Sequence, residues 1–134
     1  DDRLISKTEN SGLSEIVSFH AAVPYSDVAK QMQMASAFLL FSRFENLPCV
    51  ILEALCCGLP VISSNVGGIS EVINEQNGIL VANENISQLA DAMQQVIENY
   101  AAYDKQRISD MAKEKFSYTT VGSQYFSAYC DTPV

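Results

Sequence analysis

Apolar runs that alternate with helical patterns constrain the fold of this 134-residue chain more than any other feature. Residues 37–41 are continuously apolar, as expected of a strand that is covered on both faces. Three further segments, 16–19, 61–63 and 79–81, are also predicted to be strands, and helical patterns lie between them. Alternation of strands and helices predicts an α/β fold with a parallel, Rossmann-like sheet.

The helical segments are marked by apolar spacing and by residues that begin or end helices. Asn46 is predicted to cap an apolar helix that has Pro48 in its first turn and ends at Gly58. Apolar residues from Leu89 to Tyr100 recur at helical spacing. The other helices are predicted at 25–35, 69–73, 103–115 and around 121–129.

The helix after Pro48 carries a single charge, Glu53, among apolar neighbours. A buried carboxylate without a partner is costly, so we expect hydrogen-bond donors around Glu53, for which the hydroxyls of a ligand are natural candidates. The alternative is that Glu53 faces solvent at the edge of a domain.

Two loops are predicted at the edge of the sheet where ligands bind in such folds, namely the carboxyl ends of the strands. One loop carries His20, and the other carries Glu45 and leads into the apolar helix. The free amides at the start of that helix form an anion site. An anion site flanked by Glu45 and Glu53 suits a nucleotide sugar, which has phosphate in its middle and hydroxyl-rich groups at both ends.

Composition narrows the partners and the compartment. The net charge of −8 argues against a nucleic-acid or anionic membrane surface. No apolar run reaches membrane-spanning length. The four cysteines form no C-x-x-C pair, so we interpret them as buried small hydrophobic residues in a reducing, cytoplasmic compartment rather than as redox or metal groups.

A longer string of residues resembles a known family. Glu45 and Glu53 match the E-x7-E motif, within the segments Ser42–Pro48 and Leu52–Ile62. Val66–Val72 and Asn77–Val81 follow in the same order and spacing. The chain from about residue 16 to residue 100 therefore resembles the C-terminal nucleotide-sugar-binding domain of retaining GT-B glycosyltransferases, in the family 4-like group 1 enzymes.

The resemblance implies a role for each part of this string. Glu45 would be the catalytic residue at the donor sugar, and Glu53 would hold the ribose. The site would need no metal and no other cofactor, and the helix dipole would stabilise the leaving diphosphate. The remaining donor-binding positions form two groups. The main chain of the first group would face the sugar and diphosphate, although Pro48 has no amide to donate: Asn46, Leu47, Pro48, Cys49 and Val50. The second group, Ala22 and Val23, would border the base.

The chain also departs from the family pattern. Ala21 stands where Gly is usual, and Ser70 where Pro is usual. Two upstream strands, the cationic segment that binds diphosphate, and an acceptor-binding N-terminal domain are not in the sequence. We therefore expect residues 1–134 to be a partial C-terminal domain, with a core at 16–100 and C-terminal helices at 103–130. It would be incomplete on its N-terminal side and inactive alone, with an open sheet edge through which two copies could pair.

Several readings stay open at this point. Glu45 alone could be a solvated loop charge, and Gly67-Gly68 could equally be a plain turn or a ligand loop. His20 and Arg43 are interpreted as exposed loop residues. For the whole chain, the leading hypothesis is the donor-binding part of a hexosyltransferase that moves sugar to a glycan or lipid-linked acceptor, in the cytoplasm or at the inner face of the membrane. The alternative is a non-catalytic Rossmann-like regulatory or assembly module.

Overall fold

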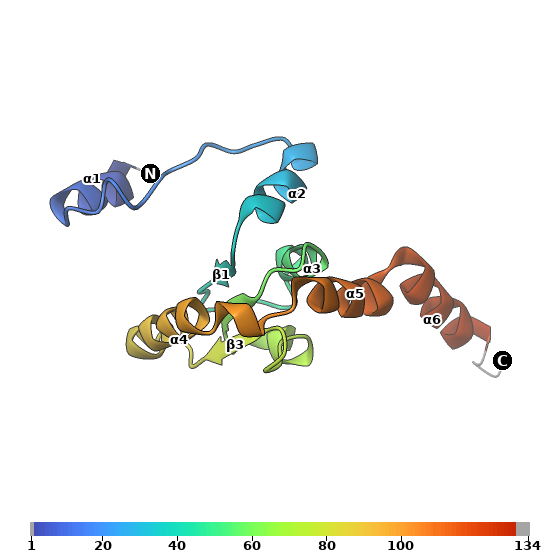
Figure 1. The fold of residues 1–134 in the computed structure, drawn as a ribbon. Helices are drawn as coiled ribbons and strands as arrows, with labels where there is room; N and C mark the ends of the chain where they lie inside the picture. The colour runs from blue at the N-terminus through green and yellow to red at the C-terminus, as the bar shows by residue number, and fades with distance from the viewer. Residues whose placement is uncertain (1, 131–134) are drawn as a thin grey trace.

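The computed structural model describes residues 2–130 and contains a small parallel sheet between layers of helix (Figure 1). Its three strands are β1 (Phe38–Leu40), β2 (Val61–Ser64) and β3 (Gly78–Val81). The helices are α1 (Asp2–Asn10), α2 (Tyr25–Met34), α3 (Cys49–Cys56), α4 (Ile86–Glu98), α5 (Lys105–Phe116) and α6 (Tyr118–Cys130), with short 3₁₀ helices η1 (Gly67–Glu71) and η2 (Tyr100–Ala102).

The sheet confirms the predicted α/β class and the parallel pairing. Its order is β1-β2-β3, with Phe38 opposite Val61 and Val61 opposite Gly78. Because consecutive strands run in the same direction, the loops after β1, β2 and β3 all leave from one end of the sheet. That shared end places the Glu45 loop beside the loop that contains Gly67.

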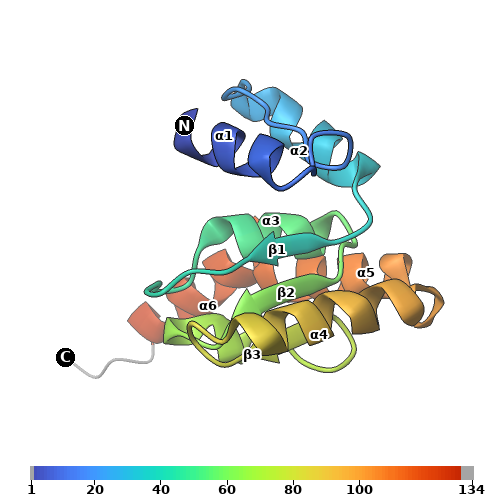
Figure 2. The same cartoon turned by 90° about the vertical axis from the view of Figure 1, so that its left-hand side faces the viewer.

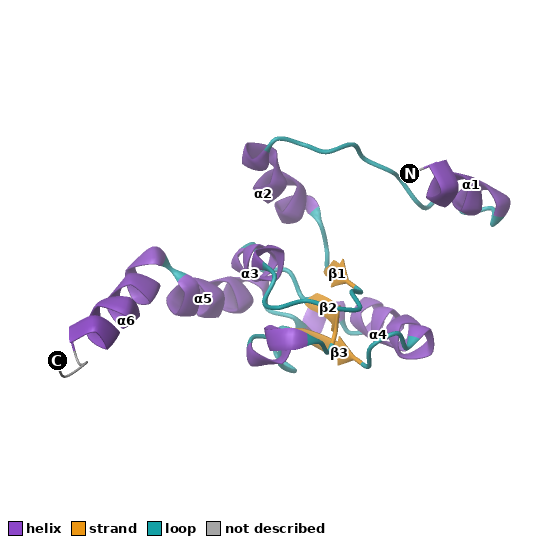
Figure 3. Cartoon of the chain, turned by 180° about the vertical axis from the view of Figure 1, so that it is seen from behind, coloured by secondary structure: helices purple, strands orange, loops and turns teal. Residues whose placement is uncertain are grey.

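Helices cover both faces of the sheet. In Figure 3, α3 and α5 lie on one side of the strands and α4 on the other. The first face is filled by a cluster that includes Ile51, Leu55 and Val61, all buried. The second face is filled by Ile62 and Val81 of the sheet together with α4. Successive residues of β2 therefore point into different cores, as the two-residue period of a strand requires.

The predicted strand at 16–19 is wrong. These residues form a turn and an irregular segment that ends at Pro24, and Ile16 is 79% exposed. A strand needs a neighbour for its main-chain groups, and the described residues provide none beside 16–19. Figure 2 shows the segment with α1 and α2 beyond β1, away from the sheet. Helix α1, which precedes it, was not predicted and buries no residue.

The prediction that 37–41 is covered on both faces is also wrong. The strand is shorter, and Leu39 at its centre is 41% exposed. In the described part of the chain β1 is an edge strand, because nothing pairs with it on the side away from β2. The open edge that the sequence led us to expect is therefore present.

Helix ends follow local capping chemistry, with one correction. Asn85 caps α4 by accepting from the amide of Gln88 at 3.0 Å, and Asp104 caps α5 in the same way. The predicted cap Asn46 is wrong, because α3 is preceded by Pro48 and has no side-chain cap. A residue before proline avoids helical backbone angles, so a helix cannot include Leu47 and begins after Pro48.

Helix α6 was predicted in outline, and in the structure it projects from the rest of the chain. It buries none of its residues, and Tyr118 is 99% exposed. Residue 1 and residues 131–134 of the predicted domain span lie outside the described residues. Within 2–130, no helix has both the length and the apolar character needed to cross a membrane.

Candidate functional site

The loop that carries Glu45 is fixed at its first residue by the neighbouring strand. The hydroxyl of Ser64 donates to the carbonyl of Ser42 at 2.5 Å and accepts from the amide of Ser42 at 3.0 Å. Ser64 is fully buried at the carboxyl end of β2. Ser63 next to it donates to the carbonyl of Leu40 at 2.9 Å. These bonds hold the exit of the Glu45 loop to the end of β2.

A second fixed point lies directly at Glu45. The amide of Gly68 donates to the carbonyl of Asn46 at 2.7 Å. Gly67 adopts a left-handed φ of 56°, and a Cβ atom there would overlap the carbonyl oxygen of Glu45 and lie 2.5 Å from that of Asn46. Only glycine meets both conditions at this position. Gly67 and Gly68 therefore support the Glu45 loop, and a role for them in a ligand loop stays a prediction.

The carboxylate of Glu45 is half-buried and makes no hydrogen bond or ion pair with any other described residue. It lies in the loop that leads from β1 into α3, four residues before Cys49, the first residue of that helix. Within residues 2–130, no three His, Cys, Asp or Glu side chains gather in a way that could hold a metal ion. Glu45 is thus available to a ligand.

The amino end of α3 leaves main-chain donors free. An α-helix offers no acceptor to the amides of its first turn, here Cys49 and Val50, and Pro48 provides no side-chain cap. Cys49 is exposed and Val50 is half-buried. These amides and the positive end of the helix dipole form a site for an anion.

Arg43 does not reach toward Glu45. Its Nε lies 2.7 Å from Oε1 of Glu84, and both side chains are largely exposed. The side chain of Asn83 donates to the carbonyl of Arg43 at 3.2 Å. Glu84 has a φ of 58°, the one positive φ among described residues other than glycine. The loop after β3 therefore contacts the Glu45 loop at Arg43, through one ion pair and one hydrogen bond.

Glu53 is half-buried, so the expectation of a buried carboxylate is wrong. The outer side of α3 is open, because α2 packs against it only in part. The hydroxyl of Tyr25, at the start of α2, donates to Oε1 of Glu53 at 3.1 Å. This hydrogen bond to the carboxylate raises the pKa of the Tyr25 hydroxyl, and the negative charge of Glu53 adds to the effect.

A cavity of about 210 Å³ opens between α2 and α3 beside this pair. Cys56 and Cys57 line it together with Met32 and Glu53. Burial raises the pKa of both thiols, which makes them poor nucleophiles at neutral pH. All four cysteines are free, but Cys49 and Cys130 are exposed, which corrects the expectation that every cysteine is buried.

The predicted base-binding residues lie in the irregular segment before α2. Ala22 and Val23 are both exposed. The link between this segment and the site is Tyr25, two residues beyond Val23. The structure thus brings Tyr25 to Glu53, while the roles of Ala22 and Val23 stay predictions.

Three residues that support the site were not identified from the sequence: Ser64, Gly67 and Tyr25. The sequence could have pointed to Ser64, because the hydroxyl of a serine in a buried strand needs a hydrogen-bond partner. Gly67 was interpreted as part of either a plain turn or a ligand loop, and its close approach to the Glu45 loop was not predicted. Tyr25 gave no signal, since its partner Glu53 is 28 residues away in the sequence.

Known proteins resemble this chain in sequence and in fold. The family model described as "Glycosyl transferases group 1" matches residues 1–115. D-inositol 3-phosphate glycosyltransferase of Paenarthrobacter aurescens is 29% identical over 123 residues, which are 90% of this chain and 30% of that protein. N-acetyl-alpha-D-glucosaminyl L-malate synthase of Bacillus anthracis is 32% identical over 108 residues, 78% of this chain and 28% of that protein. The chain thus spans less than a third of the length of these two relatives.

Among solved structures, the Anabaena protein Alr3699/HepE superposes with a TM-score of 0.85 in its complex with UDP and 0.81 in its complex with UDP-glucose. Both alignments are 24% identical and cover 98% of this chain and 36% of that one. This likeness shows the Rossmann-like fold of a GT-B domain. With the family match over residues 1–115, it places the chain in the glycosyl transferases group 1 family.

Proposed function

We propose that this chain is the donor-binding part of a retaining glycosyltransferase. The observation that carries the proposal is the free carboxylate of Glu45 in the loop that leads into the uncapped amino end of α3. The reaction would move a hexose from a nucleotide sugar to a glycan or lipid-linked acceptor. The UDP and UDP-glucose complexes of a protein with the same fold support a nucleotide-sugar donor.

The roles follow from position along the loop and the helix. The amides of Leu47, Cys49 and Val50 would hold the diphosphate and the sugar, with the helix dipole stabilising the charge that develops on the leaving group. Glu45 would contact the donor sugar near the reacting carbon, and Asn46 and Pro48 would border the same donor. Glu53 would bind the ribose hydroxyls, and Ala22 and Val23 would border the base.

The chemistry is proposed to need no metal, because backbone amides and a dipole take the place of a bound cation. We infer that residues 1–134 are part of a C-terminal domain whose partner is an N-terminal acceptor domain of the same enzyme. The enzyme would act in polysaccharide biosynthesis, in the cytoplasm or at the inner face of the membrane. Alone, the chain would be inactive, and its open β1 edge would allow two copies to pair.

One observation favours a second candidate, a non-catalytic regulatory or assembly module. The cation nearest to Glu45 in the sequence, Arg43, is paired with Glu84 instead of standing free for a diphosphate. A domain that kept the fold but not the cations would bind donors weakly and would not transfer sugar. The two candidates differ in whether Glu45 matters for turnover.

The test is sugar transfer, or slow donor hydrolysis, by the whole protein that contains this chain, with a panel of nucleotide sugars. Glu45→Gln is expected to lower kcat by at least about 100-fold, as for other groups that stabilise a transition state, while UDP affinity changes little. Glu98→Gln, an exposed change on α4, is the matched control. Full activity in Glu45→Gln would remove Glu45 from the mechanism, and no transfer by the wild type with any donor would favour the non-catalytic module. Loss of activity with a chelator would contradict the metal-free site.

A further inference from the structure

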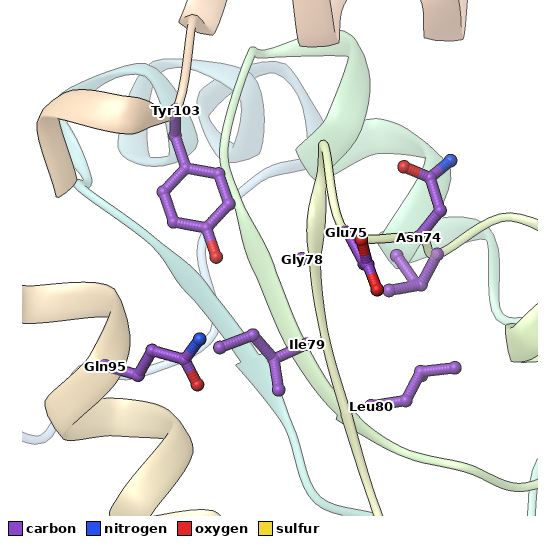
Figure 4. Close-up of a pocket in the computed structure, with 8 residues that line it drawn as sticks. Asn74, Glu75, Gly78, Ile79, Leu80, Gln95 and Tyr103 are labelled. Atoms are coloured by element: carbon purple, nitrogen blue, oxygen red, sulfur yellow. The ribbon is translucent and has the colours of Figure 1, made fainter. Parts of the chain in front are cut away.

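A larger cavity, of about 470 Å³, lies along the free edge of β3 (Figure 4). Gly78, the first residue of β3, and Ile79 and Leu80 form its floor. Its rim comes from the turn before β3 and from the end of α4. The cavity reaches the amino end of β3, whereas the Glu45 loop leaves the carboxyl end of β1. Since the strands are parallel, the cavity and the donor site belong to different ends of the sheet.

Three polar side chains around this cavity have no partner. The hydroxyl of Tyr103, the amide of Gln95 and the carboxylate of Glu75 make no hydrogen bond or ion pair with any described residue. In Figure 4 the tips of Tyr103 and Gln95 extend toward the same space beside Ile79, and Glu75 lies on the other side of Gly78. Burial raises the pKa of the Tyr103 hydroxyl, so this group remains a donor at neutral pH.

The strand edge adds main-chain groups to the same space. The carbonyl of Asn77 accepts from the amide of Val61, and the carbonyl of Val81 accepts from Asn65, both on the β2 side. Because main-chain groups alternate in direction along a strand, the carbonyls of Gly78 and Leu80 point away from β2. No described strand lies on that side of β3.

The chemistry of the lining selects the ligand class. Amide, phenol and main-chain groups provide both donors and acceptors, and the ring of Tyr103 and the side chain of Ile79 provide apolar surface. Glu75 is the one acidic or basic charge among the lining residues, so an anion would be repelled, and a metal ion would lack ligands. A sugar unit matches such a mixed lining, because it carries hydroxyl groups and also exposes the C–H groups of its ring. The volume of the cavity lies within the range of about 300–1,000 Å³ for small-molecule sites.

We propose that this cavity, which we call the β3-edge cavity, is a second carbohydrate site that holds one or two sugar units of a neutral glycan. Tyr103 and Gln95 would hydrogen-bond the sugar hydroxyls, and Glu75 would accept from one of them. The site stands apart from Glu45 and the amino end of α3. It therefore does not depend on the proposed transferase reaction, and binding alone tests it.

The test is saturation-transfer NMR of the whole protein with maltose, lactose and N,N′-diacetylchitobiose as probes. We expect at least one of these neutral disaccharides to bind, and we expect saturating UDP to leave that signal in place. Tyr103→Phe keeps the ring and Gln95→Leu keeps the side-chain bulk, so each removes hydrogen-bonding groups alone. Each change should weaken binding about 2- to 10-fold, the range for one neutral hydrogen bond. The double variant should weaken it further.

Gln94→Leu is the matched control, since Gln94 precedes Gln95 on α4 and bonds instead to Glu98 at 2.6 Å. It should leave disaccharide binding unchanged. Circular dichroism melting checks that each variant is folded. Binding by none of the three disaccharides would overturn the proposal. So would a signal that UDP abolishes, or a disaccharide affinity that is unchanged in the double variant, because both outcomes would place the sugar elsewhere.

Discussion

The α-carbon of Gly67 lies against the main-chain carbonyl of Glu45, and a side chain at Gly67 would occupy the place of that oxygen. We predict that Gly67→Ala destabilises the protein more than Gly68→Ala does. Left-handed backbone costs alanine about 1–2 kcal/mol, and the Glu45 loop must also move away. Urea denaturation measures the loss, and donor hydrolysis by the whole protein measures the displacement of Glu45.

Substitutions at two other glycines distinguish the cost of the left-handed backbone from the cost of displacing the Glu45 loop. Gly12 has a φ of 67° and open space around it, so Gly12→Ala reports the backbone strain alone. At Gly68 the nearest atom to a Cβ is a side-chain oxygen of Glu71 at 3.3 Å, so Gly68→Ala should be mild. If Gly67→Ala costs no more than Gly12→Ala, the contact with Glu45 does not constrain the loop.

Ser64→Ala provides a second test of how the loop is held. The Ser64 hydroxyl both donates to and accepts from the main chain of Ser42, so its loss leaves two groups unpaired. We expect a loss of about 1–3 kcal/mol of unfolding free energy for the buried groups. Ser63→Ala removes the bond to the Leu40 carbonyl and should cost less. Equal effects of the two substitutions would contradict the special role of Ser64.

The sheet and its covering helices were predictable because their signals are local. Val61 and Ile62 lie in a short apolar segment, and the spacing of residues such as Ala92 and Val96 defines one face of a helix. The segment 16–19 has the same apolar character but no strand to pair with. Whether an apolar segment becomes a strand depends on neighbours that its own residues do not specify.

In the candidate site, too, the local features were predictable and the contacts between distant residues were not. The spacing of Glu45 and Glu53 was visible in the sequence, and so was their place around the start of a helix. The support given by Gly67 was not visible, because it depends on a close approach of two loops. The hydroxyl of Tyr25 reaches Glu53 only because α2 packs across α3. A glycine or tyrosine in the sequence does not reveal such a partner.

The cysteines should differ in reactivity. Cys56 and Cys57 are half-buried, and burial raises the pKa of both thiols, whereas Cys49 and Cys130 are exposed. Since the thiolate is the reactive form, Ellman's reagent should modify the exposed pair first at pH 7–8, with the buried pair following only on unfolding or at higher pH. Mass spectrometry of peptic fragments identifies the sites. Early modification of Cys56 would contradict the protection of its thiol by burial.

The pair of Tyr25 and Glu53 should give a pH signature. The hydrogen bond to Glu53 raises the pKa of Tyr25 above the ordinary value of 10.0. A raised pKa in the folded state means that the stabilisation is present below the unfolded pKa and is lost as pH rises through the folded one. The stability difference between the wild type and Tyr25→Phe should therefore be constant up to about pH 9 and shrink above it. A difference that grows with pH would contradict the contact.

The final prediction concerns nucleotide binding at the same carboxylate. If Glu53 holds the ribose, Glu53→Ala removes one or two charge-assisted hydrogen bonds, each worth about 1.5–3 kcal/mol. Calorimetry with UDP and the whole protein should show this weakening. Tyr25→Phe leaves the Glu53 carboxylate in place, so UDP affinity should be largely kept. Glu98→Ala, exposed on the far helix α4, should bind UDP as the wild type does. Equal affinities for wild type and Glu53→Ala would remove Glu53 from ribose recognition, while leaving the test of Glu45 in catalysis unaffected.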